Sequence, residues 1–166
     1  MNYYDFYDSP LGKLTVVSNS EKITNLFLTT EQFDSFRSGE KFHFDHEKQC
    51  NVLQNAIRQL HEYFYEGRKE FDLPLELNGT DFQKRIWDKL REIPFGKVCS
   101  YQDIAISIGQ KNAVRAIGQA NKANKLPILI PCHRVIGKNK KLTGYAGTKT
   151  ELKAILLTHE KILFQE

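Results

Sequence analysis

The first third of the chain alternates short runs of β-favouring residues with turn signals. Runs with strand composition lie at 3–7, 14–17 and 23–28, and Ser9-Pro10-Leu11-Gly12 separates the first two. From about residue 47 the period changes, and apolar residues recur at helical spacing: Val52, Leu53, Ala56, Ile57, Leu60 and Phe64. We therefore expect a small antiparallel sheet followed by a helix that ends near Gly67.

Helical patterns dominate the second half of the chain. Thr80 and Gln83 stand at the spacing of a capping box, and Ser100 and Asp103 repeat it. The first box precedes a helix that carries Phe82, Ile86 and Leu90. The second precedes a helix that Gly109 ends. These patterns predict two helices with defined starting points.

Two further helices are expected after Gly109. Asn112 is the expected cap of one, which carries Ala113, Ile117 and Ala120. Thr148 with Glu151 is expected to open the last, which carries Leu152, Ile155, Leu156 and His159. The pair of short helices around Gly109 has the pattern of a helix-turn-helix, although most such pairs are simply packed helices.

The segment 70–79 contains Pro74 and Asn78-Gly79 and is interpreted as a linker. It divides the chain into a sheet-plus-helix domain at 1–75 and a mainly helical domain at 80–166. The fold class expected is therefore α+β.

Composition limits the functional classes. The chain has 166 residues, of which 40% are hydrophobic, and a net charge of +4. Basic residues exceed acidic ones between Lys84 and Lys153, so the second half is the better candidate for contact with a polyanion. No apolar run approaches the ~18 residues that span a bilayer, and the N-terminus lacks a signal-peptide pattern. The three cysteines, an odd number, favour a reducing compartment. We expect an intracellular protein without a membrane segment.

Cys132 is the strongest candidate for chemistry. It lies in Pro131-Cys132-His133-Arg134-Val135, after the apolar run 127–130, which predicts a buried strand ending at a nucleophile. A histidine can remove the proton of a thiol. Adjacent residues of an extended segment point to opposite sides, so contact of Cys132 with His133 needs a turn or a bridging water. A structural free cysteine is the alternative interpretation, and Glu160 is one of several carboxylates that could orient His133.

Other chemistry-bearing residues have simpler interpretations. His43, His46 and Cys50 resemble part of a metal site, but no fourth ligand is evident and we expect no metal. Cys99 and Trp87 are expected to pack in the core. The cluster Lys138–Lys141 is expected to be a solvated turn, with phosphate contact as the alternative.

Five segments, in order, resemble the alkylguanine-DNA alkyltransferases, also called methylated-DNA–protein-cysteine methyltransferases. The signature-like segment is Pro127-Ile128-Leu129-Ile130-Pro131-Cys132-His133-Arg134-Val135. The others are Ile93–Val98 with Ser100-Tyr101, Ala113–Gly118, Leu142–Gly147 and Leu156–Glu160. The resemblance covers about residues 80–160. It implies a ribonuclease-H-like first domain and a second domain with a helix-turn-helix.

The resemblance implies a role for each matching residue. Cys132 accepts the alkyl group, His133 is its base through a water, and Glu160 orients His133. Tyr101 donates a hydrogen bond to the guanine, and Asn124 braces the active-site turn. Arg115 fills the space of the extruded nucleotide, with Ala113 and Ala116 on the same helix; Lys122 and Lys125 meet phosphates. The pocket wall consists of Tyr145, Ala146 and Gly147.

The implied activity is DNA repair by direct damage reversal. An alkyl group of 6-O-alkylguanine, and of 4-O-alkylthymine, is transferred once and irreversibly to Cys132. The target atom lies inside the base stack, so the base must be flipped out. The partner implied is double-stranded DNA bound through its minor groove, by a cytoplasmic monomer without cofactor. The chain departs from the family pattern at Thr148-Lys149-Thr150, one residue longer and without a second glycine.

Three other functions fit parts of the pattern. An alkyltransferase-like binding protein typically lacks the cysteine that Cys132 provides. A cysteine hydrolase using Cys132, His133 and Glu160 gives no role to the Tyr101 and Arg115 segments. A helix-turn-helix regulator leaves Pro131-Cys132-His133-Arg134 unexplained. Acceptance of an alkyl group from methylated duplex DNA separates all of them.

Overall fold

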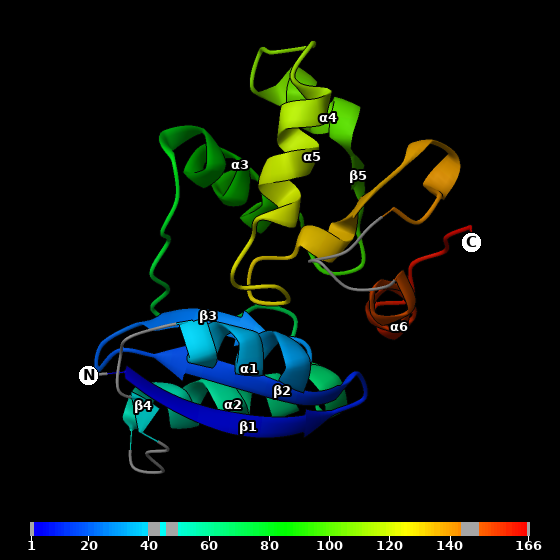
Figure 1. Ribbon diagram of the computed structural model, residues 1–166. Helices are drawn as coiled ribbons and strands as arrows, with labels where there is room; N and C mark the ends of the chain where they lie inside the picture. Colours follow the sequence, from blue (N-terminus) through cyan, green and yellow to red (C-terminus); the bar gives the residue numbers. More distant parts are fainter. Residues whose placement is uncertain (1, 40–43, 46–49, 144–149, 166) are drawn as a thin grey trace. The chain divides into compact units, whose positions relative to one another are not determined.

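The computed structural model describes residues 2–39, 44–45, 50–143 and 150–165 (Figure 1). The chain divides into two compact units, Met1–Leu77 and Asn78–Glu166. The first is a sheet with helices and the second is mainly helical, so the α+β fold class is confirmed.

The first unit is built on a four-stranded sheet of order β3-β2-β1-β4. Its strands are β1 (Asn2–Ser9), β2 (Gly12–Ser18), β3 (Ile23–Phe27) and β4 (Phe44–Asp45). The first three pair antiparallel, as predicted, and β4, which the sequence did not predict, pairs parallel to β1. Gly12 joins β1 to β2 at φ 108°, a conformation that favours glycine.

Helices cover both faces of this sheet. Tyr4 and Phe6 of β1 pack with Phe33 of α1 (Thr30–Gly39). Tyr7, which points to the other face because side chains alternate along a strand, contacts His61 of α2 (Asn51–Tyr65). The helix α1 was not predicted. The helix α2 was, and it ends as expected, with Gly67 at φ 78° directly after its cap.

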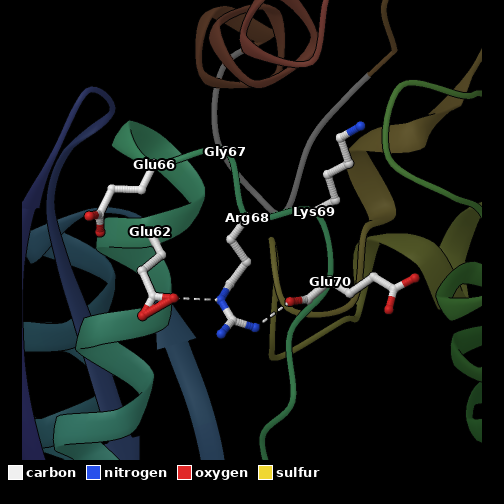
Figure 2. Close-up of a pocket in the computed structure, with 6 residues that line it drawn as sticks. All are labelled: Glu62, Glu66, Gly67, Arg68, Lys69 and Glu70. Atoms are coloured by element: carbon white, nitrogen blue, oxygen red, sulfur yellow. Dashed lines mark hydrogen bonds and ion pairs between the residues drawn. The ribbon is translucent and has the colours of Figure 1, made fainter.

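The chain leaves α2 along an open pocket, which Figure 2 shows. Arg68 occupies its centre: its Nε donates to Glu62 Oε2 at 3.0 Å, and its Nη1 donates to the carbonyl of Glu70 at 2.7 Å. Farther on, Pro74 accepts from the amide of Ile23 at 2.8 Å. The segment predicted to be a linker is therefore bound to the first unit over its initial part, through Arg68 and the first residue of β3.

The second unit contains α3 (Asp81–Arg91), α4 (Tyr101–Ser107), α5 (Val114–Lys122) and α6 (Thr150–His159). Two short strands, β5 (Cys99–Ser100) and β6 (Val135–Ile136), pair parallel. Both predicted capping boxes are present, at Thr80 and at Ser100. Gly109, at φ 71°, follows the end of α4 as expected. The expected cap Thr148 lies outside the described residues.

The prediction that Asn112 caps α5 is wrong. The helix begins at Val114, and Ala113 occupies the cap position without a side-chain hydrogen bond. The amide of Ala113 donates to the carbonyl of Gln110 at 3.0 Å. This turn satisfies the backbone there, so the helix begins one residue later than a cap at Asn112 requires.

Contacts from α3 hold α4 and α5. The indole of Trp87 is buried, as expected, and its Nε1 donates to the carbonyl of Ala120 in α5 at 2.9 Å. Arg85 Nη2 donates to the carbonyl of Ile108 at the end of α4, at 3.0 Å. The two short helices around Gly109 are therefore supported by one helix. Among the described residues, no helix is long and apolar enough to cross a membrane.

Gly79→Ala is expected to destabilise the second unit by about 1–3 kcal/mol, because a Cβ there meets the Trp87 ring at 2.5 Å and the ring is buried. Trp87 is the only tryptophan, so its fluorescence during urea unfolding reports on this unit. Gly118→Ala, whose Cβ makes only an ordinary contact at 3.9 Å, is the matched control and is expected to be neutral or slightly stabilising. Equal stability of the two variants would contradict the packing argument.

Candidate active site

The segment before Cys132 is a turn and not the strand that the sequence predicted. Ile128 has φ 74°, which no strand permits. Asn124 stabilises the turn from both ends: its Nδ2 donates to the carbonyl of Ile130 at 2.9 Å, and its Oδ1 accepts from the amide of Leu126 at 3.0 Å. The apolar residues are buried as expected, but these side-chain bonds take the place of strand pairing.

Cys132, His133 and Arg134 form one turn of 3₁₀ helix, and all three are buried. The amide of Cys132 donates to Ile130 at 2.7 Å, and the amide of Arg134 donates to Pro131 at 3.0 Å. Successive residues of a 3₁₀ helix are about 120° apart, not on opposite sides as in a strand. The turn that the sequence required between thiol and imidazole is therefore present.

Glu160, at the end of α6, accepts hydrogen bonds from three residues of two segments. His133 Nε2 lies 2.6 Å from its Oε2. Arg134 donates to both carboxylate oxygens, from Nε at 2.8 Å and from Nη2 at 3.0 Å. The amide of Gly96 donates to Oε1 at 3.1 Å. The side chain of Glu160 is fully buried, so this carboxylate is held in one orientation against His133.

Arg134 is a site residue to which the sequence analysis gave no role. Besides its two bonds to Glu160, its Nη1 donates to the carbonyl of Ile93 at 2.7 Å, and its guanidinium lies over the Phe95 ring. A planar fork of donors suits a carboxylate better than any other side chain does. The available signal was its position beside His133, which brings it within reach of the same acid.

Tyr101 reaches the site through the pairing of β5 with β6. Cys99 pairs with Val135 and Ser100 with Ile136, so the first residue of α4 lies next to the strand that follows His133 and Arg134. The Tyr101 hydroxyl is 2.9 Å from Thr143 Oγ1. Lys153 of α6, also absent from the sequence-based candidates, donates to the same oxygen at 3.2 Å. The sequence could have indicated it, because Lys153 stands at helical spacing from Leu156, Leu157 and Glu160 and so lies on the same face of the helix.

Burial controls the protonation of these groups. It raises the pKa of Cys132 to about 11, against the opposing effects of a hydrogen bond with Asn124 and the charge of Lys153. It also lowers the pKa of His133, despite Glu160, and lowers the pKa of Lys153 to about 8. Burial would raise the pKa of Glu160, but His133 and Arg134 outweigh it and hold that pKa below its usual value. At neutral pH the site therefore holds a thiol, a neutral imidazole, a carboxylate and an ammonium group.

The residues expected to meet DNA lie on or next to α5. Arg115, Ala116, Lys122 and Lys125 are exposed, and Ala113 is half-buried. The Lys138–Lys141 segment is exposed, as expected for a solvated turn. The expected pocket residues Tyr145, Ala146 and Gly147 lie outside the described residues.

The remaining candidates make no second site. Cys99 is half-buried in β5, less enclosed than expected, and Cys50 lies 3.7 Å from Ser18 Oγ. His43 and His46 lie outside the described residues. Within the part of the chain that the structure describes, no three His, Cys, Asp or Glu side chains group as metal ligands.

Comparison with known protein families gives two matches. Residues 2–77 match the family described as 6-O-methylguanine DNA methyltransferase, ribonuclease-like domain. Residues 81–162 match 6-O-methylguanine DNA methyltransferase, DNA binding domain. Together the two matches include nearly the whole chain.

Individual relatives match over the same length. The constitutive methylated-DNA–protein-cysteine methyltransferase of Bacillus subtilis is 49% identical over 166 residues, 100% of this chain and 99% of its own. That of Methanosarcina barkeri is 41% identical over 162 residues, 96% of this chain and 97% of its own. Each match therefore covers nearly the full length of the relative.

Solved structures are similar as well. The crystal structure of the Mycobacterium tuberculosis O6-methylguanine methyltransferase has a TM-score of 0.85 and 41% identity, covering 97% of this chain and 93% of its own. The Mycobacterium tuberculosis OGT in complex with DNA has a TM-score of 0.84 and 40% identity, covering 96% and 92%.

The depressed pKa of Glu160 makes stability depend on acid pH. A carboxyl whose folded pKa lies below its unfolded value, about 4.3, contributes stability above that pH, and the contribution disappears as the pH falls. Glu160→Gln is expected to cost about 3 kcal/mol at pH 7, because it leaves Arg134 buried without its carboxylate. The difference from wild type should shrink below about pH 4.3, measured by urea unfolding followed through Trp87. Glu151→Gln, exposed on the same helix, should track the wild type, whereas a constant deficit of Glu160→Gln from pH 7 to pH 3 would contradict the linkage.

Proposed function

Since the chain belongs to the methylated-DNA–protein-cysteine methyltransferase family, which repairs DNA by transferring an alkyl group to one of the protein's own cysteines, we propose that Cys132 is the acceptor. One observation carries this assignment. Cys132 lies in the same buried turn as His133, and His133 faces a carboxylate that Arg134 and Gly96 hold in place. A soft sulfur nucleophile suits displacement at the saturated carbon of an alkyl group.

The transfer forms a sulfur–carbon bond as the carbon–oxygen bond of 6-O-alkylguanine breaks. The electron pair of the broken bond stays on the guanine. The thiol proton passes through a water to His133 and, by way of solvent, replaces the alkyl group on the guanine, which remains as the neutral base. The same chemistry applies to 4-O-alkylthymine. A thioether cannot be reversed by thiol exchange, so each molecule acts once.

His133 and Glu160 make this proton transfer possible. A buried thiol with a pKa raised to about 11 does not ionise by itself at neutral pH. Because Nε2 of His133 faces Glu160, the proton is exchanged through Nδ1 of the same ring. The imidazolium so formed is stabilised by the Glu160 carboxylate, whose orientation depends on Arg134.

The proposal also gives roles to Tyr101, to Asn124 and to three residues that the family resemblance assigns to the pocket. Tyr101 donates a hydrogen bond to the guanine ring, where negative charge develops as the base leaves. Asn124 braces the turn that carries Cys132. Tyr145, Ala146 and Gly147 form the pocket wall.

DNA is the partner, and we assign its contact to α5. The exposed guanidinium of Arg115 enters the duplex in place of the flipped nucleotide. Ala113 and Ala116 are small and permit close approach in the minor groove, whose readout depends little on sequence. Lys122 and Lys125 contact phosphates. The protein works as a monomer, without cofactor, in the cytoplasm, which suits three free thiols.

The assignment of Cys132 is tested by incubating the protein with a duplex that contains 6-O-methylguanine. Intact-protein mass is expected to increase by one methyl group per molecule, and peptide mapping should find it on the peptide that contains Cys132. Cys132→Ser should gain no mass yet still bind the duplex. Multiple turnovers, or the methyl group on Cys50 or Cys99, would overturn the assignment.

The role of Arg115 is tested by comparing duplex with free base. Flipping costs a few kcal/mol in a duplex and nothing for a free base, so Arg115→Ala should slow methyl transfer from the duplex tenfold or more and leave transfer from free 6-O-methylguanine nearly unchanged. Lys122→Ala, exposed on the same helix, is the control: it should weaken duplex binding at increasing salt without slowing the bound complex. Equal losses of Arg115→Ala on both substrates would assign it to the pocket.

A further inference from the structure

Lys153 is a fully buried cation that the transfer mechanism does not use. It is 0% exposed, and within the described residues no carboxylate forms an ion pair with it. Burying a charge without a counter-charge is costly, so such a group is a candidate for a functional role. Burial lowers the pKa of Lys153 to about 8, and the ammonium form therefore predominates at neutral pH.

Lys153 forms hydrogen bonds both next to the turn of Cys132 and with the residue that contacts Tyr101. Its Nζ donates to the carbonyl of Val135 at 2.5 Å, directly after the turn that carries Cys132. The same Nζ donates to Thr143 Oγ1 at 3.2 Å, and that oxygen lies 2.9 Å from the Tyr101 hydroxyl. A continuous hydrogen-bonded chain thus runs from Lys153 through Thr143 to Tyr101.

The direction of this chain follows from the donors available. An ammonium group can only donate, so Thr143 accepts from Lys153. A hydroxyl that accepts from a cation becomes a stronger donor, because successive hydrogen bonds polarise one another. Either hydroxyl can donate to the other across the 2.9 Å between them, and the polarised Thr143 hydroxyl is the stronger donor of the two. The Tyr101 proton then points away from Thr143 and is left for another acceptor.

We propose that Thr143 and Lys153 are positioning residues that force Tyr101 to be a hydrogen-bond donor toward the leaving guanine. This inference rests on the proposed role of Tyr101 in transfer. Without the charge of Lys153, the Tyr101 hydroxyl can donate its proton to Thr143, and the departing base then meets a lone pair where it needs a proton; without the Thr143 hydroxyl, Tyr101 loses the polarisation that makes it a stronger donor. With the chain, the charge of Lys153 also strengthens the Tyr101 donor as negative charge grows on the base.

The test uses four variants and the single-turnover rate of methyl transfer from bound duplex. Thr143→Val keeps the shape of the side chain and removes the hydroxyl; it is expected to slow transfer about tenfold without weakening duplex binding. Thr143→Ser keeps the hydroxyl and should restore the wild-type rate. Tyr101→Phe should be at least as slow as Thr143→Val. The double variant should be no slower than Tyr101→Phe alone, because Thr143 acts only through the Tyr101 hydroxyl.

The outcomes separate this inference from the proposed function. If Tyr101→Phe is slow but Thr143→Val matches the wild type, the relay is wrong and the role of Tyr101 stands. If Tyr101→Phe matches the wild type, the donor role of Tyr101 fails and the relay with it. Multiplicative effects in the double variant, or failure of Thr143→Ser to restore the rate, would assign Thr143 to packing. Trp87 fluorescence verifies that each variant is folded.

Lys153→Met tests the source of the polarisation. Lys153 also acts electrostatically on Cys132, so Lys153→Met should reduce the transfer rate in both the wild-type and the Thr143→Val background. The reduction should be about tenfold smaller in the Thr143→Val background, where the link to Tyr101 is already broken. Equal slowing in both backgrounds would assign Lys153 to Cys132 alone and overturn its part in the relay. If Lys153→Met does not fold, the comparison of Thr143→Val with Thr143→Ser still decides whether the link from Lys153 to Tyr101 matters.

Discussion

The Glu160 carboxylate is the interaction on which the rest of the site depends. It accepts from His133, from Arg134 and from the amide of Gly96, and so joins α6 to the turn of Cys132 and to the segment after α3. A buried carboxylate without these donors would be protonated or excluded. With them, its pKa falls below the ordinary value and it stays ionised. Catalysis and folding of the second unit therefore rely on the same four hydrogen bonds.

The charges around Cys132 favour a negative charge on its sulfur. The site holds one buried carboxylate, Glu160, and two buried cations, Arg134 and Lys153, so a negative charge that forms on the sulfur enters an environment with an excess of positive charge. Burial outweighs the opposing effects of Asn124 and Lys153 and raises the pKa of Cys132 to about 11, so the resting group is the thiol. In the transfer that we propose, the nucleophile forms only when His133 takes the proton, and this confines its reactivity to a bound and aligned substrate.

The proposed acceptor and the helices proposed to contact DNA share their supports. The side-chain Nδ2 of Asn121, on α5, donates to the carbonyl of Cys132 at 3.5 Å, and the indole of Trp87 on α3 donates to the carbonyl of Ala120 on the same helix. Tyr101, the first residue of α4, is held beside β6 by strand pairing. The helix that we propose to meet DNA is thus connected to Cys132 through one or two contacts, so the same framework can position the nucleotide and hold the thiol.

Sequence alone determined what depends on neighbours along the chain. The capping boxes at Thr80 and Ser100, the helix stop at Gly67 and the fold class follow from local patterns, and the motif around Cys132 identified the family. Tertiary structure decided the rest. The 127–130 run is a turn because Asn124 bonds to it from outside, and α5 begins after Asn112 because a backbone turn already satisfies Ala113. The roles of Arg134 and Lys153 follow only from the structure, in which Arg134 contacts Glu160 and Lys153 contacts Thr143. Contacts between residues far apart in the chain produce no periodic pattern in a sequence.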